Sequence, residues 1–600
     1  MSARPLTIAD WQRAYLVEGA SPRERLSALV KDLGKDDPAW ISRADQAFID
    51  AQLNQIEGRD RKAMPLFGVP FAVKDNIDVA GLPTTAACPT FSFAPDRHAT
   101  VVERLMHAGA IVIGKTNLDQ FATGLVGTRS PYGEVPNTFD PAYVSGGSSA
   151  GSASVVARGI VPFALGTDTA GSGRVPAGFN NIVGLKPTPG SVPMQGVLPA
   201  CRSLDVVSIF ALTVADAAEV MAVMEGAAGE PSFQYHAPRP AWLGRPGTPL
   251  RIGVPLDPAC DVELGYERAF NAALERLHHP DYACRNIDFA PMLAVARLLY
   301  EGPWVAERYT VVQSLIESRP EAMDPVVRQV ISAAGKHDAV AAFRARYRLE
   351  ELRQVIEPMW RDIDVLMVPT APTCPTRAAV RNDPVLRNSE LGKFTNFVNL
   401  LGMAAIAVPA GLTDKGLPFG VTFIAPGGSD AALANLAARW QAESELPLGA
   451  RLGPPHNDAL VLRKMPAAAP TLLVAVVGAH LAGMPLHHQL VDRGCRLLER
   501  TTTSPDYRLY ALPGTTPPKP GLARVDANGV AIEVEVYEMP EGAVGSFLAL
   551  IAPPLGLGTV RLASGTAVTG FICEPAGLLG ASDISAFRGW RAYIASITEK

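Results

Sequence analysis

The sequence has few cysteines, and none of them are spaced as in a metal or redox motif. Its seven cysteines are scattered, odd in number and never arranged as CxxC. Disulfide scaffolds and structural zinc sites both need clustered cysteines. We therefore expect a reduced, cytoplasmic protein whose chemistry uses no metal and no other cofactor.

The sequence also lacks a large excess of charge and any long apolar run without helix breakers. A formal net charge of −5 over 600 residues gives no basic surface for nucleic acid. The N-terminus has no apolar core typical of a signal peptide. The uncharged stretch 543–560 contains two prolines and several glycines, which makes it a poor membrane helix. These absences predict no nucleic-acid partner and no membrane span.

Hydrophobic residues make up 48% of the chain, enough for a large core. Spaced apolar positions predict that residues 1–60 are helical. Short apolar runs then alternate with helical stretches, which predicts an α/β domain with a mixed sheet covered by helices on both faces. Proline and small polar residues accumulate before a new strand-rich pattern begins. We predict a large domain over 1–455, a linker over 456–470 and a smaller α+β domain over 471–600. The runs expected as strands of the larger domain are 67–73, 111–113, 161–165, 365–368 and 406–408.

Two serines in glycine-rich runs and one upstream lysine carry the strongest chemical signal. Ser148 lies in Ser-Gly-Gly-Ser-Ser-Ala-Gly, Ser172 in Gly-Thr-Asp-Thr-Ala-Gly-Ser-Gly-Arg, and Lys74 in Phe-Ala-Val-Lys-Asp-Asn. Glycines beside a serine let the backbone approach a substrate and direct its amides toward a developing negative charge. A lysine that loses its proton easily can activate such a serine without histidine. The three segments together predict an enzyme that cleaves amides.

Other interpretations of these segments remain open. Residues 109–116 fit the phosphate-loop pattern, but the intervening Ala-Ile-Val-Ile favours a strand, so Lys115 is interpreted as structural. Residues 147–151 fit the GxSxG elbow of α/β-hydrolases, which needs a later acid and histidine that no recognisable motif supplies. Asp75 offers a third alternative, because a salt bridge would hold Lys74 protonated and make the chain a binding scaffold.

The three segments, in this order and spacing, resemble the amidase signature family over about residues 25–440. The resemblance implies Lys74 as the base, Ser148 as the bridging serine and Ser172 as the nucleophile. Burial without a carboxylate partner would bring the pKa of the lysine down from about 10.4, as a base requires. The implied oxyanion hole consists of the backbone amides of Thr169, Ala170, Gly171 and Ser172.

Two details of residues 167–174 around Ser172, here called the nucleophile loop, qualify this resemblance. The family usually has glycine where Ala170 stands, and alanine keeps the amide donor provided that no positive φ is needed. Asp168 and Arg174 flank the nucleophile, and we interpret them as structural supports of the loop.

Residues 300–309 form a second informative segment. Tyr300, Trp304 and Arg308 repeat every four residues, which predicts one shared helical face, although Gly302-Pro303 could open the helix. Arginine presents a fork that fits a planar carboxylate. This segment, the sequence around the nucleophile and the extra C-terminal domain resemble the allophanate hydrolase family. The resemblance implies that Tyr300 and Arg308 hold allophanate and that the backbone around Gly124 contacts it.

The C-terminal region resembles the γ-glutamylcyclotransferase-like domain that is appended in allophanate hydrolases. Residues 474–487 join a strand to a glycine-bearing loop that contains His480. We single out His480 as a candidate functional residue, with Glu533 and Glu535 as candidate acidic partners. The implied task is processing of the first product, N-carboxycarbamate, by decarboxylation or hydrolysis. The alternative is that this domain only builds the oligomer.

The resemblance therefore implies hydrolysis of allophanate (urea-1-carboxylate) to ammonia and carbon dioxide through a Ser-Ser-Lys acyl-enzyme. It also implies a homodimer that works after a biotin-dependent urea carboxylase. Two other enzyme functions remain open: an amidase for another small amide such as biuret or malonamide, and an amidotransferase subunit that passes ammonia to a partner.

Overall fold

The chain folds into two compact units. The first contains residues 1–243 and 251–468, and the second contains residues 244–250 and 469–600. None of the helices in the described ranges combines the length and the apolar character needed to cross a membrane. The computed structural model describes residues 6–34, 36–226, 242–244, 248–450, 452–453, 457–466 and 470–598.

The predicted linker 456–470 lies only partly within the described residues. Its described part contains a short 3-10 helix at Asn457–Leu460. Residues 456 and 467–469 lie outside them. The domain boundaries at 455 and 471 stay a prediction.

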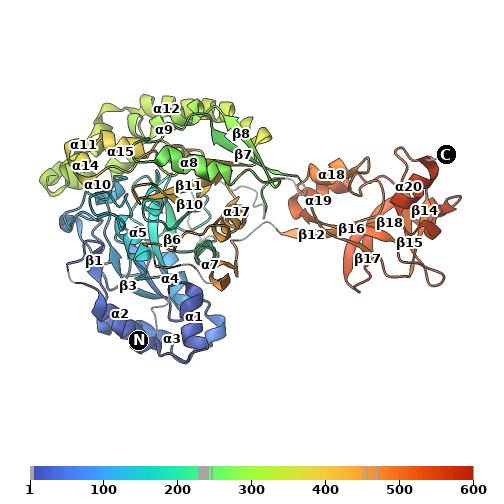
Figure 1. The fold of residues 1–600 in the computed structure, drawn as a ribbon, viewed down its shortest axis with the longest axis horizontal. Coiled ribbons are helices and arrows are strands. Elements are labelled where there is room, and N and C mark those ends of the chain that lie inside the picture. The colour runs from blue at the N-terminus through green and yellow to red at the C-terminus, as the bar shows by residue number, and fades with distance from the viewer. Residues whose placement is uncertain are drawn as a thin grey trace. The chain divides into compact units, whose positions relative to one another are not determined.

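An eleven-stranded mixed sheet forms the centre of the first unit (Figure 1). Its strands in spatial order are β1 (Trp40–Arg43), β3 (Ile111–Thr116), β2 (Pro70–Lys74), β4 (Phe163–Asp168), β6 (Val206–Ala211), β5 (Val183–Lys186), β10 (Ala404–Leu412), β11 (Pro418–Ala425), β9 (Val365–Pro369), β7 (Leu250–Pro255) and β8 (Tyr282–Ile287). β2 runs parallel to β3 and β4, whereas β4 and β6 are antiparallel. Every residue of β2, β3, β4, β6, β9 and β11 is buried, so both faces of the sheet are covered. The predicted fold class is confirmed, and each of the five predicted runs overlaps a strand.

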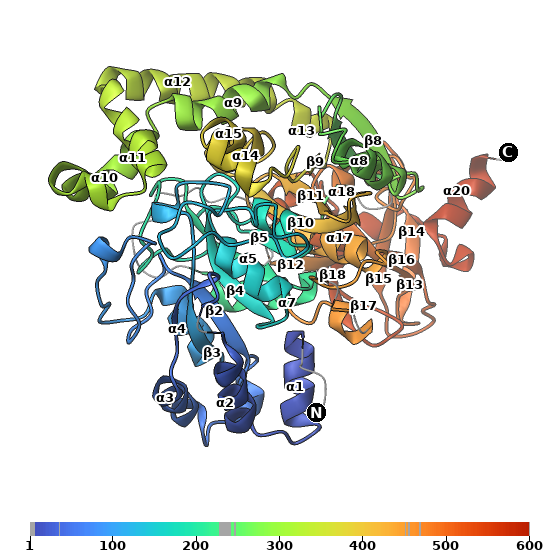
Figure 2. The same ribbon diagram turned by 60° about the vertical axis from the view of Figure 1, so that its left-hand side comes forward.

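Helices surround this sheet. α5, α6, α7 and α17 pack on its central strands, and both views show α9 to α12 gathered along one side of the first unit (Figures 1 and 2). The helices of this unit are α1 (Ile8–Leu16), α2 (Pro22–Asp32), α3 (Gln46–Ile56), α4 (Thr100–His107), α5 (Ala150–Ala157), α6 (Val175–Phe179), α7 (Val214–Met224), α8 (Tyr266–Glu275), α9 (Ala290–Glu301), α10 (Val305–Ser318), α11 (Pro325–Ser332), α12 (Ala339–Ile356), α13 (Met359–Asp362), α14 (Arg377–Asn382), α15 (Leu386–Leu391), α16 (Asn396–Leu400) and α17 (Asp430–Ala442).

One strand lies in the region predicted to be helical. Residues 1–60 contain α1, α2 and α3, but β1 separates α2 from α3 and pairs antiparallel with β3. Four residues are too few to show the two-residue alternation of a strand against a helical background.

The second unit is smaller and rich in strands. Its five-stranded sheet has the order β13 (Arg496–Thr502), β16 (Glu533–Pro540), β12 (Thr471–Val476), β18 (Ala567–Cys573) and β17 (Leu555–Arg561). A three-stranded sheet contains β15 (Pro520–Arg524), β14 (Tyr507–Ala511) and β19 (Ser582–Asp583). Its helices are α18 (His487–Val491), α19 (Glu541–Leu548) and α20 (Trp590–Thr598). Apolar side chains from both sheets and the helices share one core, which fits the predicted α+β domain.

Candidate active site

Lys74, the last residue of β2, lies buried among hydroxyl groups. Its Nζ donates hydrogen bonds to the Oγ of Ser148 and to the Oγ1 of Thr167, both at 2.8 Å. Burial lowers the pKa of Lys74 to about 7, although nearby carboxylates, Asp119 foremost, raise it. Lys74 is therefore partly neutral at pH 7, as a general base must be.

The two serines lie in the loops that precede α5 and follow β4. Ser148 and Ser172 are 0% and 3% exposed, and the peptide bond between Gly147 and Ser148 is cis. The hydrogen bonds of the described residues include one between Lys74 and Ser148 but none between the hydroxyls of Ser148 and Ser172. The structure thus places the predicted base, Lys74, in contact with the predicted bridging serine, Ser148. Catalytic hydrogen bonds often close only when substrate binds, so the missing contact does not exclude the proton path.

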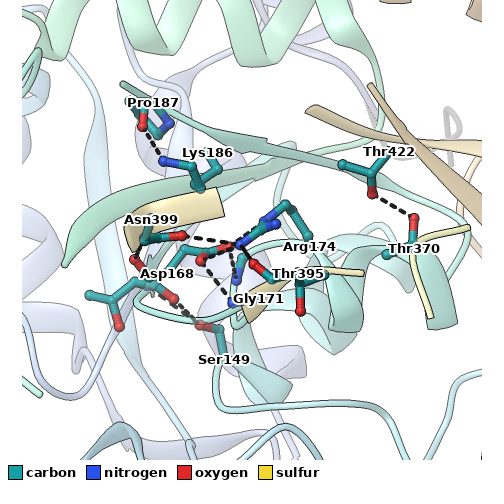
Figure 3. A network of polar contacts seen from close by, with 12 residues as sticks. Ser149, Asp168, Gly171, Arg174, Lys186, Pro187, Thr370, Thr395, Asn399 and Thr422 are labelled. Carbon is teal, nitrogen blue, oxygen red and sulfur yellow. Dashed lines mark hydrogen bonds and ion pairs between the residues drawn. The ribbon is translucent and has the colours of Figure 1, made fainter. Parts of the chain in front are cut away.

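Asp168, at the end of β4, holds the nucleophile loop from behind (Figure 3). Its carboxylate accepts hydrogen bonds from the backbone N–H groups of Gly171 at 2.9 Å and Gly173 at 3.0 Å. It also accepts from the Nε and Nη2 of Arg174, both at 2.9 Å. Burial raises the pKa of Asp168, but Arg174 outweighs this and leaves it below its ordinary value. The carboxylate therefore stays ionised, which agrees with the interpretation of these two residues as loop supports.

One of the predicted oxyanion donors is already engaged. The Gly171 N–H donates to Asp168. The backbone hydrogen bonds of the described residues leave the N–H groups of Thr169, Ala170 and Ser172 without an acceptor. Ala170 has no positive φ, so alanine fits where the family usually has glycine. These three amides remain as donors for an oxyanion.

A second layer fixes the same loop from α16. The Nη2 of Arg174 donates to the carbonyl of Thr395 and to the Oδ1 of Asn399, both at 3.2 Å. The Nδ2 of Asn399 donates to the carbonyls of Asp168 at 2.8 Å and Leu204 at 3.0 Å. Figure 3 shows the contacts that Arg174 makes with Asp168, Thr395 and Asn399. The backbone that carries the nucleophile is thus held through both a carboxylate and an amide side chain.

Asp75 pairs with a lysine other than Lys74. Its Oδ1 lies 3.1 Å from the Nζ of Lys115, and both side chains are 0% exposed. Its Oδ2 accepts hydrogen bonds from the backbone N–H and the hydroxyl of Thr85. The structure therefore contradicts the alternative in which Asp75 forms a salt bridge with Lys74 and keeps it protonated. Lys115 lies inside β3, so the phosphate-loop pattern falls on a buried strand.

Gly124 lies against a buried carboxylate. Asp119 accepts backbone N–H groups of Val126 at 3.3 Å, Gly127 at 3.0 Å and Arg129 at 3.0 Å. A Cβ on residue 124 would lie 2.5 Å from the Oδ2 of Asp119. Packing against Asp119 is enough to require glycine at 124, and its contact with a substrate stays a prediction.

The prediction that Tyr300, Trp304 and Arg308 share one face of a single helix is wrong. α9 ends before Gly302, and α10 begins after Trp304. Pro303 has no backbone N–H, so the helical hydrogen-bond ladder is interrupted there. The break nevertheless keeps the two predicted residues together: the guanidinium carbon of Arg308 lies 5.6 Å from the ring centroid of Tyr300.

Arg308 is buried with part of its guanidinium unused. Its Nη1 donates to the Oγ1 of Thr123 at 3.0 Å and to the carbonyl of Ala122 at 3.3 Å. Its Nη2 has no hydrogen-bond partner among the described residues. After burial, the charge of Arg308 is a further factor that lowers the pKa of Lys74, so this guanidinium acts within reach of the base. Phe121 and Ala122 both have positive φ, a strain that is typical of functional sites.

The C-terminal candidate His480 lines a small pocket of about 30 Å³ together with Lys519 and Phe571. Its ring stacks on Phe571 at 5.0 Å between centroids, and its Nε2 lies 2.9 Å from the Oε1 of Gln489. Burial lowers the pKa of His480, which favours the neutral ring.

Glu533 and Glu535 do not partner this histidine. Both carboxylates form ion pairs with Arg591 at 2.7 Å, and Glu535 also pairs with Arg500 at 3.0 Å. Two arginines therefore satisfy the two acids that were predicted as partners of His480.

Comparison with known proteins identifies the family to which this chain belongs. The amidase family model matches residues 40–434, about two thirds of the chain, and includes Lys74, Ser148 and Ser172. The chain belongs to the amidase family. A second family model, that of the allophanate hydrolase C-terminal domain, matches residues 472–595. The predicted class of amidohydrolase is confirmed.

This amidase is similar along nearly its whole length to two fungal proteins. It is 47% identical to urea amidolyase from Saccharomyces cerevisiae over 99% of this chain, which corresponds to 33% of the yeast protein. It is 43% identical to Kluyveromyces lactis allophanate hydrolase, with a TM-score of 0.83, covering 98% of this chain and 99% of that one. The chain therefore spans about a third of the curated urea amidolyase and nearly all of the solved allophanate hydrolase.

The amidase part alone has wider similarity. A glutamyl-tRNA(Gln) amidotransferase subunit from Synechococcus is 33% identical over 74% of this chain and 98% of that protein. About a quarter of this chain is therefore outside the match to this amidotransferase subunit.

The sequence alone did not point to several polar residues of this amidase site. Thr167 accepts from Lys74 and lies within the nucleophile motif, so its position was a signal available in the sequence. Asp205 is buried, which raises its pKa to about 6, and it accepts from the hydroxyl of Thr169. Neither Asp205 nor the distant Asn399 belongs to a recognisable motif.

Proposed function

We propose that this chain hydrolyses allophanate at the Ser172 site. The observation that carries the proposal is the buried Arg308, whose free Nη2 lies beside Tyr300 and within electrostatic reach of Lys74. Allophanate is a small planar anion with a terminal amide, and a guanidinium fork suits its carboxylate. The similarity to Kluyveromyces lactis allophanate hydrolase along both chains supports the same substrate.

In the proposed reaction, neutral Lys74 takes a proton from Ser148, which takes one from Ser172. The Oγ of Ser172 forms a bond to the terminal amide carbon, and the N–H groups of Thr169, Ala170 and Ser172 hold the oxyanion. Losing one such donor typically costs about 2.7–4 kcal/mol of transition-state stabilisation.

The tetrahedral intermediate then collapses. The proton on Lys74 returns through Ser148 to the leaving nitrogen, the C–N bond breaks and ammonia departs. The acyl group stays on Ser172 as an ester until water, deprotonated along the same path, attacks it. The released product is N-carboxycarbamate.

We extend the proposal to the C-terminal unit. The pocket beside His480 combines a largely neutral imidazole with the cationic Lys519, a pair suited to the dianionic N-carboxycarbamate. Decarboxylation or hydrolysis there would yield carbon dioxide. The alternative is that this unit only supports a homodimer and the product decomposes unaided.

The source of the substrate is part of the proposal. The relatives named urea amidolyase are three times as long as the matched region, and we propose that a biotin-dependent urea carboxylase supplies allophanate to this chain. We also propose a cytoplasmic homodimer, on the resemblance alone.

Two other substrates or roles are weaker. Biuret and malonamide contain the same terminal amide but no carboxylate for Arg308. An amidotransferase subunit would need a partner to receive ammonia, and the match to that group covers only 74% of this chain.

The deciding experiment measures ammonia release from allophanate by the purified chain, with Ser172→Ala alongside and biuret as a competing substrate. Release from allophanate that is lost in the variant establishes both substrate and nucleophile. Serine-dependent release from biuret alone would keep the amidase site and reject Arg308 as a carboxylate ligand.

A further inference from the structure

Residues 200–205, here called the bridging segment, contact both the nucleophile loop and α10. On one side, the hydroxyl of Thr169 donates to the carboxylate of Asp205. On the other, the backbone N–H of Ser203 donates to the Oε2 of Glu307 at 2.9 Å, and its hydroxyl donates to the Oε1. The segment therefore connects the oxyanion donors to the helix that carries Arg308.

The bridging segment is internally braced. The Oδ2 of Asp205 accepts the N–H groups of Ala200 at 2.7 Å and Cys201 at 3.0 Å. The carbonyl of Cys201 accepts the N–H groups of Leu204 and Asp205, both at 2.9 Å. Cys201 and Leu204 also share an apolar cluster with Ala170 of the nucleophile loop. A turn closed in this way transmits a displacement rather than absorbing it.

Asn399 adds a second link between the same parts. Its amide donates to the carbonyls of both Asp168 and Leu204 (Figure 3 shows the Asp168 side). The bridging segment is thus tied to the nucleophile loop at two points, through Asp205 and Leu204. Its polar connection to α10 is the carboxylate of Glu307, together with a contact from the Cys201 thiol to the Trp304 carbonyl at 3.7 Å.

Glu307 and Arg308 are consecutive residues of α10, and their side chains contact different parts of the site. Arg308 is directed to Thr123 and the proposed substrate carboxylate, whereas Glu307 grips Ser203. We propose that Glu307 is a positioning residue that fixes the spacing between Arg308 and the oxyanion donors. This inference rests on the proposed function, because it takes Arg308 as the ligand of the substrate carboxylate.

The inference has a selective consequence. A substrate held at one end by Arg308 is presented to Ser172 only if that spacing is correct. A reagent that reacts with Ser172 without binding Arg308 should react at a rate that does not depend on this spacing. Weakening the hydrogen bonds between Ser203 and Glu307 should therefore slow turnover of allophanate and leave the intrinsic reactivity of Ser172 unchanged.

The test compares Glu307→Gln and Ser203→Ala with the wild-type chain. For each, kcat and KM on allophanate are measured together with the rate at which a fluorophosphonate labels Ser172. We expect Glu307→Gln to lower kcat about tenfold, because small misplacements of a bound substrate are costly. The labelling rate should stay within about twofold, since the nucleophile loop keeps its other supports.

The variants separate positioning from other roles of this carboxylate. Glu307 lies in the first turn of α10, where an acid also stabilises the helix dipole. Ser203→Ala leaves that charge in place and should still lower kcat, whereas Ser203→Thr keeps a hydroxyl and should restore it. Glu317→Gln, an exposed acid in the last turn of the same helix, is the matched control and should behave as wild type.

A double-mutant cycle completes the test. In an Arg308→Met background, Glu307→Gln should have little further effect on kcat/KM, because the spacing no longer matters. Additive losses would overturn the inference, as would an equal loss of labelling and turnover. If the wild-type chain releases no ammonia from allophanate, the proposed function fails and takes this inference with it; activity with additive losses rejects the inference alone.

Discussion

At the scale of single residues, the site depends on how each buried charge is paired. Lys74 is surrounded by hydroxyls, and burial lowers its pKa to about 7. Asp168 is equally buried, but Arg174 holds it ionised. The same burial therefore yields a base in one place and a fixed anion in the other.

The first prediction concerns pH. Lys74 must be neutral to accept a proton, and its pKa lies near 7. We expect kcat/KM on allophanate to rise roughly tenfold between about pH 6 and about pH 8, as the neutral fraction grows. Lys74→Arg should be inactive throughout, since arginine stays protonated. A profile that is flat over this range would show that another group limits the reaction.

The second prediction concerns Arg308. Arg308→Met removes the guanidinium and should raise KM for allophanate roughly 10- to 100-fold, the usual worth of a hydrogen bond to a charged group. Arg308→Lys keeps the charge but loses the fork, so its KM should lie between that of the wild-type chain and that of Arg308→Met. Steady-state ammonia release measures both, and an unchanged KM in Arg308→Met would remove Arg308 from the substrate site.

The residues that could be predicted from the sequence are those within short motifs. Lys74, Ser148 and Ser172 each lie in a run whose composition indicates chemistry, and the structure places Lys74 against Ser148. Asn399 reaches the nucleophile loop from more than 200 residues away, so no local pattern could reveal it. The acidic partners predicted for His480 were wrong, because no pattern in the sequence shows that Arg591 pairs with both acids.

At the scale of elements, the length and the ends of each helix and strand determine whether the sequence predicts it. The apolar runs located five strands of the main sheet, but β1 was too short to stand out from its helical neighbours. Four-residue spacing suggested one helix across residues 300–309, and Pro303 divides it into two. Tyr300 and Arg308, the pair predicted to bind substrate, nevertheless lie together, because packing rather than helical periodicity brings them into contact.

The third prediction tests the nucleophile loop as an element. Gly171 has φ +135°, and a Cβ there would lie 2.4 Å from the Oγ1 of Thr395. Gly171→Ala should lower the free energy of unfolding by about 1–3 kcal/mol, the usual cost of such a backbone conformation. It should also abolish most ammonia release, because the oxyanion donors move with it.

Gly411 on β10 is the matched control for this substitution. It has no positive φ, and a Cβ added there would meet no atom within 4 Å, so Gly411→Ala should change stability by no more than about 0.5 kcal/mol. Thermal unfolding and ammonia release compare the two. Equal behaviour of both variants would mean that the loop tolerates side chains at 171.

At the scale of the whole molecule, the chain contains two units with separate cores. The first holds the Ser172 site, and the second contains the pocket beside His480. Because no residue is shared between these two sites, a change in one should leave the chemistry of the other intact.

The fourth prediction follows from this separation. His480→Ala should leave ammonia release unchanged while slowing the appearance of carbon dioxide, if the second unit processes N-carboxycarbamate. His488→Ala, an exposed histidine on α18, serves as the control and should affect neither. Unchanged carbon dioxide release in His480→Ala would assign the second unit a structural role.

Strand β2 shows how one feature can serve both folding and reactivity. Its residues are buried on both faces, so the apolar pattern barely distinguishes one pairing register from the next. The charges that end it do distinguish them: Lys74 meets Ser148 and Thr167, while Asp75 meets Lys115 and Thr85. A slip of one residue in one direction would bring Lys74 beside Lys115, and a slip in the other direction would bring Asp75 to Ser148. Lys74 therefore also helps to fix the pairing register of β2 during folding, because like-charge repulsion opposes the slip that would bring it beside Lys115.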